Sequence, residues 1–152
     1  MQSNLQQIFW SWALERYEAD SLRDCLLALQ ESSDLVVLEA LFFAWLAEQG
    51  RELTATEVRH MEEVIAPWVD EVLVPLRLQR VRWSDHQESA LLRREALRLE
   101  LEAEKTVATL LCETLMTPFS GPAKVSFRSN LSLITSLSCS DDLDLLIAAF
   151  ER

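Results

Sequence analysis

The sequence feature that most constrains the fold is a continuous apolar stretch from Asp34 to Gln49, DLVVLEALFFAWLAEQ. Apart from its two end residues, only Glu39 and Glu48 are polar. A helix that is apolar on every side is stable only inside a domain or a bilayer. Such a helix would be about 24 Å long. A membrane span needs roughly 20 apolar residues, which is more than this stretch contains, and Glu39 would lie at mid-membrane. The stretch therefore predicts a buried central helix that other helices surround.

Glu39 is the one charged residue in the interior of that helix. At 100° per residue it shares a face with the largest apolar groups of the stretch, namely Leu35, Phe42, Phe43 and Leu46. One hypothesis is a desolvated carboxyl with a raised pKa, which acts as a general acid or base or anchors a cationic ligand. The alternative is a core carboxyl paired with an arginine or a tryptophan N–H, or a partly wet helix face. We favour the alternative, because no residue nearby in sequence supplies a second catalytic group.

Length and composition predict a single all-α domain over residues 1–152. A chain of this length with 49% hydrophobic residues can bury a sizeable core, and two glycines and four prolines are too few for the turns of an all-β fold. The three cysteines, Cys25, Cys112 and Cys139, form no C-x-x-C pair, so we expect small core residues in a reducing cytoplasm. The N-terminal segment resembles neither a secretory signal nor an anchor. We therefore expect a cytoplasmic helical bundle without a membrane span.

Hydrophobic periodicity predicts two helices before the central one. Apolar residues recur at helical spacing over Asn4 to Glu18, and again from Ser21 to about Gln30. Ser21, with Asp24 three residues later, is close to a capping box. The polar residues 31–33 are expected to cap the central helix.

A T-x-x-E capping box at Thr54 and Glu57 opens the next predicted helix, whose apolar rhythm continues to Leu76. Pro67 and Pro75 interrupt this segment without changing its phase. Each proline removes a backbone N–H and crowds the carbonyl four residues before it. We therefore predict a break or kink at Pro67 and a kink at Pro75. The result would be one bent helical segment.

The longest predicted helix runs from Asp85 to Met116, with Ser84 and Gln87 as its capping residues, because this segment contains no glycine or proline. Leucines and alanines follow a heptad-like line along it. Arg94 and Glu104, however, occupy positions where that line requires apolar groups. A coiled coil is therefore disfavoured.

The serine-rich residues 117–140 are a candidate mobile connection to a short C-terminal helix that begins at Ser140. Within the connection, Leu131, Ile134 and Leu137 have helical spacing, and we prefer a short helix capped near Ser129 or Asn130 over a strand. The predicted fold is thus a bundle around a central helix, with one long helix and a short final helix.

No motif assigns catalysis, a metal or a cofactor. Glu57 and His60 share a helix face, as in half of a di-iron site, but His86, the other histidine, does not supply the second half. A G-x-S-x-G nucleophile elbow is absent, and Gly50 and Gly121 stand alone where a phosphate-binding loop requires several glycines. We predict no catalytic residue, no metal site and no cofactor.

Charge is distributed unevenly along the chain. The net charge of −11 argues against a DNA-binding protein, yet residues 77–98 carry 6 basic and 3 acidic groups, whereas residues 1–76 carry 4 and 14. With Trp83 at its centre, this basic segment is a candidate surface for an acidic protein or an RNA. The candidate residues are Arg77, Arg80, Arg82, Trp83, Arg93, Arg94 and Arg98. Alternatively, the arginines only neutralise acidic helices beside them.

The leading functional prediction is a non-catalytic interaction or regulatory protein that binds another protein, or a second copy of itself, through Pro75 to Arg98. Arginine and tryptophan are enriched where binding energy concentrates, and the acidic remainder would steer a charged partner to this segment. The alternative is a binding protein or enzyme for a small apolar or cationic ligand. That site would centre on Glu39, Trp45 and Trp68, although five tryptophans in one small domain more often fill a core.

Four short elements resemble a family of small bacterial proteins of unknown function. They are Phe9-Trp10-x-x-Ala13, Ala44-Trp45-Leu46, Ala66-Pro67-Trp68 with Val72 and Pro75-Leu76-Arg77, and Leu101-Glu102-Ala103-Glu104. The resemblance extends from about Ile8 to Leu115, and its most specific part contains the two prolines. It implies a bacterial cytoplasmic helical protein and supplies no catalytic residues to transfer.

Overall fold

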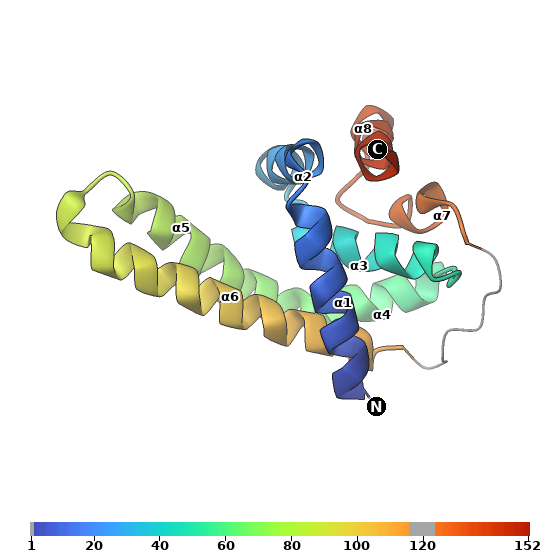
Figure 1. The fold of residues 1–152 in the computed structure, drawn as a ribbon, viewed down its shortest axis with the longest axis horizontal. Helices are drawn as coiled ribbons and strands as arrows, with labels where there is room; N and C mark the ends of the chain where they lie inside the picture. Colours follow the sequence, from blue (N-terminus) through green and yellow to red (C-terminus); the bar gives the residue numbers. More distant parts are fainter. Residues whose placement is uncertain (1, 116–123) are drawn as a thin grey trace.

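The computed structural model describes residues 2–115 and 124–152, and this part of the chain is all-α, with no strand (Figure 1). The α-helices are α1 (Gln2–Tyr17), α2 (Asp20–Ser33), α3 (Val37–Glu48), α4 (Ala55–Trp68), α5 (Val74–Trp83), α6 (Ala90–Glu113), α7 (Phe127–Leu131) and α8 (Ser140–Glu151). A π-helical turn, η1 (Val69–Leu73), joins α4 to α5, and a 3-10 turn, η2 (Gln87–Ser89), precedes α6. The helices form one domain, as the sequence predicts.

Helix α3 is the predicted central helix, and it is buried over nearly its whole length. Phe42 and Trp45 pack against Phe9 of α1, with ring centroids 5.1 and 5.2 Å from that of Phe9. One hydrophobic core includes these rings and buried side chains from α1, α2, α4, α6, α7 and α8. Burial of α3 on every side thus brings together segments from both ends of the chain.

The start of the central helix and of α2 differs from the prediction. Helix α2 continues through Ser33, and Asp34 ends it in the left-handed conformation (φ 57°), with a backbone N–H bond to Leu29 O. Aspartate tolerates this conformation better than most residues. Val36 and Ala19 are the N-cap residues of α3 and α2, and neither side chain makes a cap hydrogen bond. The polar residues 31–33 therefore extend α2 instead of capping α3, and Ser21 lies inside α2.

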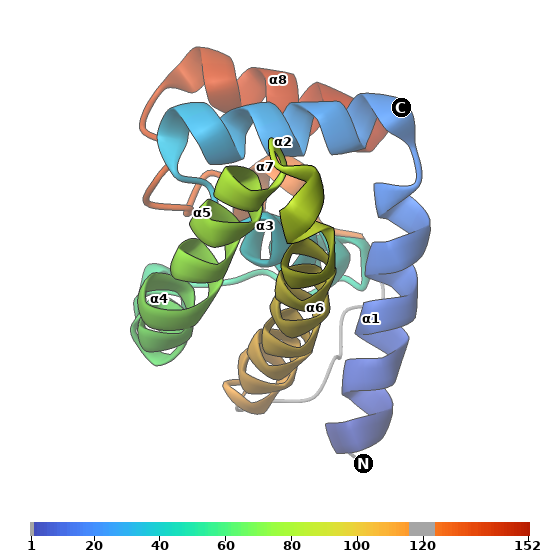
Figure 2. The ribbon, with the colours of Figure 1, turned by 90° about the vertical axis from the view of Figure 1, so that its left-hand side faces the viewer.

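The helices that cover α3 come from separate parts of the chain. Helix α7 makes the most extensive contact with α3, followed by α1 and α6, whereas α4 packs mainly on α6 and η1. Helices α2 and α8 lie side by side in Figure 2, and α8 also contacts α7. Helix α7 thus contributes to the cover of α3, although its five residues are too few for a clear periodic signal in the sequence.

The two prolines bracket the π-helical turn η1. The capping box of Thr54 and Glu57 is present, and α4 continues past Pro67 to Trp68. Pro75 then lies in the first turn of α5, where a missing N–H costs little. The predicted interruption therefore exists, but the backbone stays helical through five residues of wider winding.

Helices α5 and α6 pair as a hairpin that extends away from the rest of the molecule (Figure 1). We call residues 74–101 the arm. The long helix begins at Ala90 and not at Asp85, because Ser84 ends α5: its hydroxyl donates to Val81 O at 2.6 Å. The prediction that Ser84 caps the long helix is thus wrong, and Met116 lies outside the described residues.

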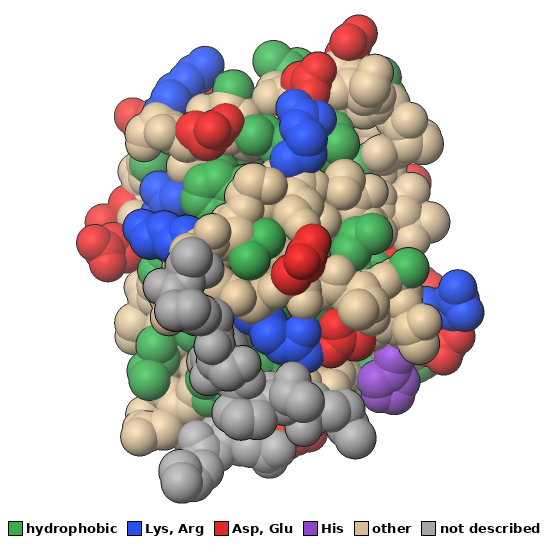
Figure 3. Space-filling model, turned by 90° about the vertical axis from the view of Figure 1, so that its right-hand side faces the viewer, with side chains coloured by type: hydrophobic (Ala, Val, Ile, Leu, Met, Phe, Trp, Pro, Cys, Tyr) green, Lys and Arg blue, Asp and Glu red, His purple; other side chains and the backbone are tan. Residues whose placement is uncertain are grey.

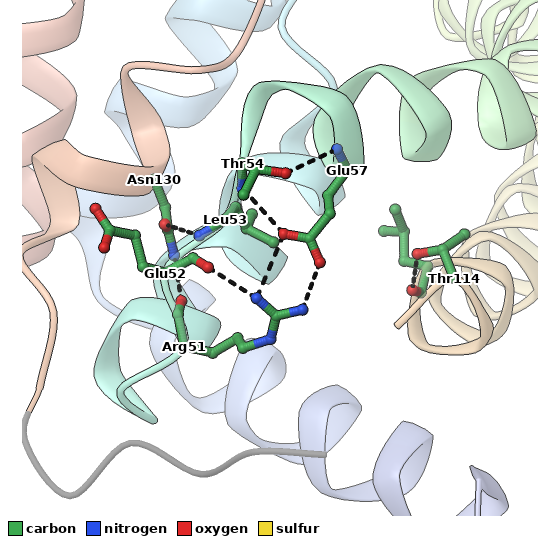
Figure 4. A network of polar contacts seen from close by, with 8 residues as sticks. Arg51, Glu52, Leu53, Thr54, Glu57, Thr114 and Asn130 are labelled. Atoms are coloured by element: carbon green, nitrogen blue, oxygen red, sulfur yellow. Dashed lines mark hydrogen bonds and ion pairs between the residues drawn. The ribbon is translucent and has the colours of Figure 1, made fainter. Parts of the chain in front are cut away.

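The described part of the serine-rich segment is fastened to the core by Asn130 (Figure 4). Its fully buried amide nitrogen donates to Phe43 O at 3.1 Å and Arg51 O at 2.9 Å, and its oxygen accepts from Leu53 N at 2.9 Å. Helix α7 begins earlier than predicted, because the Ser126 side chain caps it by accepting from Ser129 N. Residues 117–123 of the predicted mobile connection lie outside the described residues.

The cysteines and the apolar length of the helices were also subjects of sequence predictions. Cys112 is buried as predicted, but Cys139 is exposed at the N-cap of α8, and all three thiols are free. None of the described helices is long and apolar enough to cross a membrane.

We predict that replacing Asn130 by alanine lowers the free energy of unfolding by about 3 kcal/mol, because two carbonyl oxygens and one N–H lose their buried partner. Urea titration followed by circular dichroism measures the loss. The matched control is Ser132→Ala in the exposed turn after α7, with an expected change below about 0.5 kcal/mol. A loss below about 1 kcal/mol for Asn130→Ala would show that the amide does not secure this segment.

Candidate functional site

One candidate site is a partly enclosed cavity of about 570 Å³ where the arm leaves the body of the protein. Side chains from α1, α2, α3, η1, α5 and α6 line it. Most are apolar, and they include Trp10, Leu14, Leu41 and Leu73. Small-molecule sites have this size and this predominantly apolar lining, with a few polar groups that fix orientation. We call this space the arm-base cavity.

The helices of the arm supply four charged groups of the arm-base cavity. Arg77 and Arg80 lie on α5, Glu100 and Glu104 on α6, and Tyr17 at the end of α1. Arg80 binds Glu100 through two hydrogen bonds, Nε to Oε2 at 2.5 Å and Nη2 to Oε1 at 3.2 Å. This bidentate ion pair, with a nearly buried Glu100, links the two helices where the arm begins.

Glu104 is the second carboxyl of this cavity. Desolvation by burial, together with the charge of Glu100, raises its pKa to about 7, against the opposing charges of Arg80 and Arg77. The pKa of Tyr17 is also raised, first by burial and then by the charge of Glu104. Near neutral pH, Glu104 is therefore present in both its protonated and its charged form.

The π-helical turn η1 supplies one wall of the cavity. Val69, Asp70 and Leu73 all line it, and Val74 and Arg77 continue the same wall into α5. Each such turn widens the helix and shifts the side chains that follow, and such turns are frequent at functional sites. Here the shift lies immediately before Arg77, so it helps to set which face of α5 meets the cavity.

Glu39, the central residue of the predicted ligand site, is buried in the core and does not line the arm-base cavity. Burial, then the charge of Glu62 and a hydrogen bond with it, raises the pKa of Glu39 to about 8. Glu62 lies on α4 and also accepts from Thr135 Oγ1 at 2.7 Å. The contact that acts on Glu39 is thus with a second carboxyl, the raised pKa agrees with the hypothesis of a desolvated group, and Glu39 is mostly protonated at pH 7.

The two tryptophans of that prediction lie in different places. Trp45 packs among aromatic rings of the core. Trp68 is 36% exposed and lines an open groove between η1, α5 and α6, together with Val72, Leu76 and Leu99. The structure therefore does not bring Glu39, Trp45 and Trp68 into one shared pocket.

The predicted basic surface divides into paired and unpaired arginines. Arg80 binds Glu100, and Arg98 binds Glu95 at 3.1 Å. Among the described residues, Arg82, Arg93 and Arg94 form no ion pair, and all three are exposed. Trp83 is half-buried at the end of α5. Neutralisation of neighbouring acids thus accounts for Arg80 and Arg98 but not for Arg82, Arg93 and Arg94, whereas Arg77, which also forms no ion pair with a described residue, lines the arm-base cavity.

In the E-x-x-H motif of α4, the glutamate has a structural role. Arg51 binds both carboxylate oxygens of Glu57, which also accepts from Thr54 N (Figure 4). His60 is exposed. Within residues 2–115 and 124–152, no cluster of histidine, cysteine, aspartate or glutamate is placed to hold a metal ion.

The arm-base cavity was not predicted as a site, although the sequence contains one signal for it. Glu104 interrupts the apolar line of the long helix, and a charged residue at such a position often faces a specialised environment. Tyr17 and Glu100 gave no comparable signal, because a tyrosine and a glutamate fit an ordinary helix surface. Their proximity depends on how α1 packs across α6, which local spacing does not reveal.

We predict that Glu39→Gln removes part of the pH dependence of stability. A folded-state pKa of about 8 lies above that of the unfolded chain, near 4.3, so the native state holds an extra proton between these values. Stability therefore falls as pH rises from 5 to 8, with a slope of up to about 1.4 kcal/mol per pH unit from this group. Glu104 acts in the same direction up to about pH 7.

Denaturant unfolding at several pH values tests this effect. Glu39→Gln should match the wild type near pH 5 and be more stable at pH 8, because the amide is never charged. Glu63→Gln, on the exposed side of α4, is the matched control and should keep the wild-type slope. Parallel stability profiles for Glu39→Gln and the wild type would contradict the prediction.

Comparison of the sequence with known proteins finds a match to a protein family. A family model described as "Protein of unknown function (DUF2390)" matches residues 8–111, from α1 to near the end of α6. Neither the curated proteins nor the solved structures contain a significant match to the chain.

Proposed function

The chain belongs to the family of proteins of unknown function DUF2390, and because that description assigns no activity, we propose a function from the arm: non-catalytic binding of an acidic, amphipathic helix of another protein in the bacterial cytoplasm. The observation that carries this proposal is the exposure of large apolar side chains on the arm. Of the twelve that are exposed in the described part of the chain, seven lie on α5 and α6. They are Leu78, Val81, Leu91, Leu92, Leu97, Leu99 and Leu101.

The pairing of α5 with α6 buries little apolar surface. Within the arm, Ala96 is the one buried apolar residue, and α5 has none. A surface helix normally buries its apolar face against a neighbour, and clustered exposed leucines mark interaction sites. A third helix laid along the arm would supply the missing cover.

Helical phase places charge beside the exposed leucines. At 100° per residue, Leu97 and Leu101 lie on one face of α6, with Arg94 and Arg98 on its edge. Arg82 and Arg93 add unpaired positive charge to the arm. By contrast, outside the residues drawn in grey, acidic and basic side chains are interspersed on the opposite end of the molecule (Figure 3). An apolar row edged by arginines favours a helix with an apolar face and acidic flanks.

The first test reverses the three unpaired charges with Arg82→Glu, Arg93→Glu and Arg94→Glu. Cross-linking in bacterial cells, followed by purification, should recover a partner with the wild type and at least about tenfold less with the variant, because both the attraction and the encounter rate are lost. The matched control is Arg59→Glu with Lys124→Glu, which reverses exposed charges outside the arm and should leave recovery unchanged. Equal recovery with both variants would refute the arm as the binding surface.

The second test removes apolar surface with Leu97→Ser and Leu101→Ser. Because both side chains are already about two-fifths exposed, their loss should lower the free energy of unfolding by less than about 1.5 kcal/mol while it abolishes partner recovery. Light scattering on the purified wild type identifies the alternative partner, a second copy of the chain. If the wild type has the mass of a dimer and the variant with Leu97→Ser and Leu101→Ser has the mass of a monomer, the partner is a second copy of the chain and not a helix of another protein.

A further inference from the structure

Besides Gln30, Asp34 and Asp70, three polar groups of the arm-base cavity have no side-chain hydrogen bond to any described residue, and these three interact electrostatically through Glu104. They are the hydroxyl of Tyr17, the guanidinium of Arg77 and the carboxyl of Glu104. Arg80 and Glu100, by contrast, satisfy each other. The cavity therefore contains a fixed ion pair next to three groups that are free to bind something else, under walls that are mainly apolar.

The charged side chains of the cavity favour some head groups of a bound ligand over others. A cationic head at Glu104 would lie within the field of both Arg77 and Arg80, which already act on this carboxyl. A carboxylate head would instead meet Arg77, whose planar fork matches it in geometry and charge. The hydroxyl of Tyr17 and the protonated form of Glu104 are further donors. Asp34 and Asp70 also line the cavity, but both are exposed, so solvent screens their repulsion.

We propose that the arm-base cavity binds a small molecule with an apolar body and a single carboxylate head, which Arg77 binds through its guanidinium. The apolar body lies against α1 and α3, where Trp10, Leu14 and Leu41 form the wall. Tyr17 and Glu104 donate hydrogen bonds to the carboxylate, and the Arg80–Glu100 pair holds the two arm helices around it. This site is separate from the exposed leucines to which the proposed helical partner binds.

Binding should strengthen as pH falls from 8 to 6. Glu104 must be protonated to donate, and its charged form would repel the ligand. The groups that face Glu104 are Glu100 on α6, Arg77 and Arg80 on α5, and Tyr17 on α1, with Asp70 of η1 on the rim. Because the amide of Glu104→Gln can donate and is never charged, this variant should retain binding and lose the pH dependence.

The test uses decanoate and 2-naphthoate as carboxylate probes, with decan-1-ol and decylamine as heads of different charge. Isothermal calorimetry reports binding to the full chain, and so does intrinsic tryptophan fluorescence, to which Trp10 in the cavity wall contributes. We expect one equivalent of at least one carboxylate to bind, and the alcohol and the amine to bind at least about tenfold more weakly, as expected for loss of a charged hydrogen bond. Binding of neither carboxylate, or of the amine or alcohol equally well, overturns the proposal.

Variants locate the site and separate it from the arm surface. Arg77→Gln should weaken carboxylate binding by about tenfold or more, whereas Arg82→Gln on the same helix, away from the cavity, should not change it. Circular dichroism establishes that both variants are folded. The leucine variants Leu97→Ser and Leu101→Ser should bind decanoate normally, so a failure of the helix-binding function leaves this result intact. Equal affinity in Arg77→Gln and the wild type would overturn the proposal.

Discussion

Burial of α3 is the constraint on which the rest of the structure depends. A helix without a polar face cannot lie at a surface, so α1, α2, α6 and α7 must each contribute part of its cover. The same burial determines the state of Glu39, because a carboxylate in that environment would cost more than protonation does. Asn130 then completes the cover with side-chain hydrogen bonds to Phe43 O in α3 and to backbone groups of Arg51 and Leu53, which follow α3 and lie outside any helix.

The accuracy of the sequence predictions follows the range of the interactions that decide each feature. The Thr54 capping box and the burial of α3 are set by residues within a few positions, and both were predictable. The start of α6 was not, because Ser84 can end one helix as readily as begin the next. The meeting of Tyr17 with Glu104 and the choice of Glu62 as partner of Glu39 depend on packing between distant segments, and spacing along one helix carries no information about either.

The two candidate binding regions differ in how firmly they are packed. The arm-base cavity lies between several helices and contains a bidentate ion pair, whereas the arm consists of two helices that bury little besides alanine. Local stability decreases where few apolar contacts are buried, so the tip of the arm should open more readily than its base. Such a difference suits a rigid pocket next to a surface that adjusts to a helical partner.

The contact between Asn130 and α3 also has a consequence for biosynthesis. Phe43 and Asn130 are separated by 87 positions, so the ribosome completes the most apolar helix long before it makes the residue that secures its cover. At about 5–20 residues per second, that interval is roughly 4–17 s. During this time the nascent chain contains Phe42, Phe43 and Trp45 but lacks the part of the cover of α3 that α7 supplies. The emerging polypeptide is therefore a candidate client of ribosome-associated chaperones, although the finished domain hides every one of these rings.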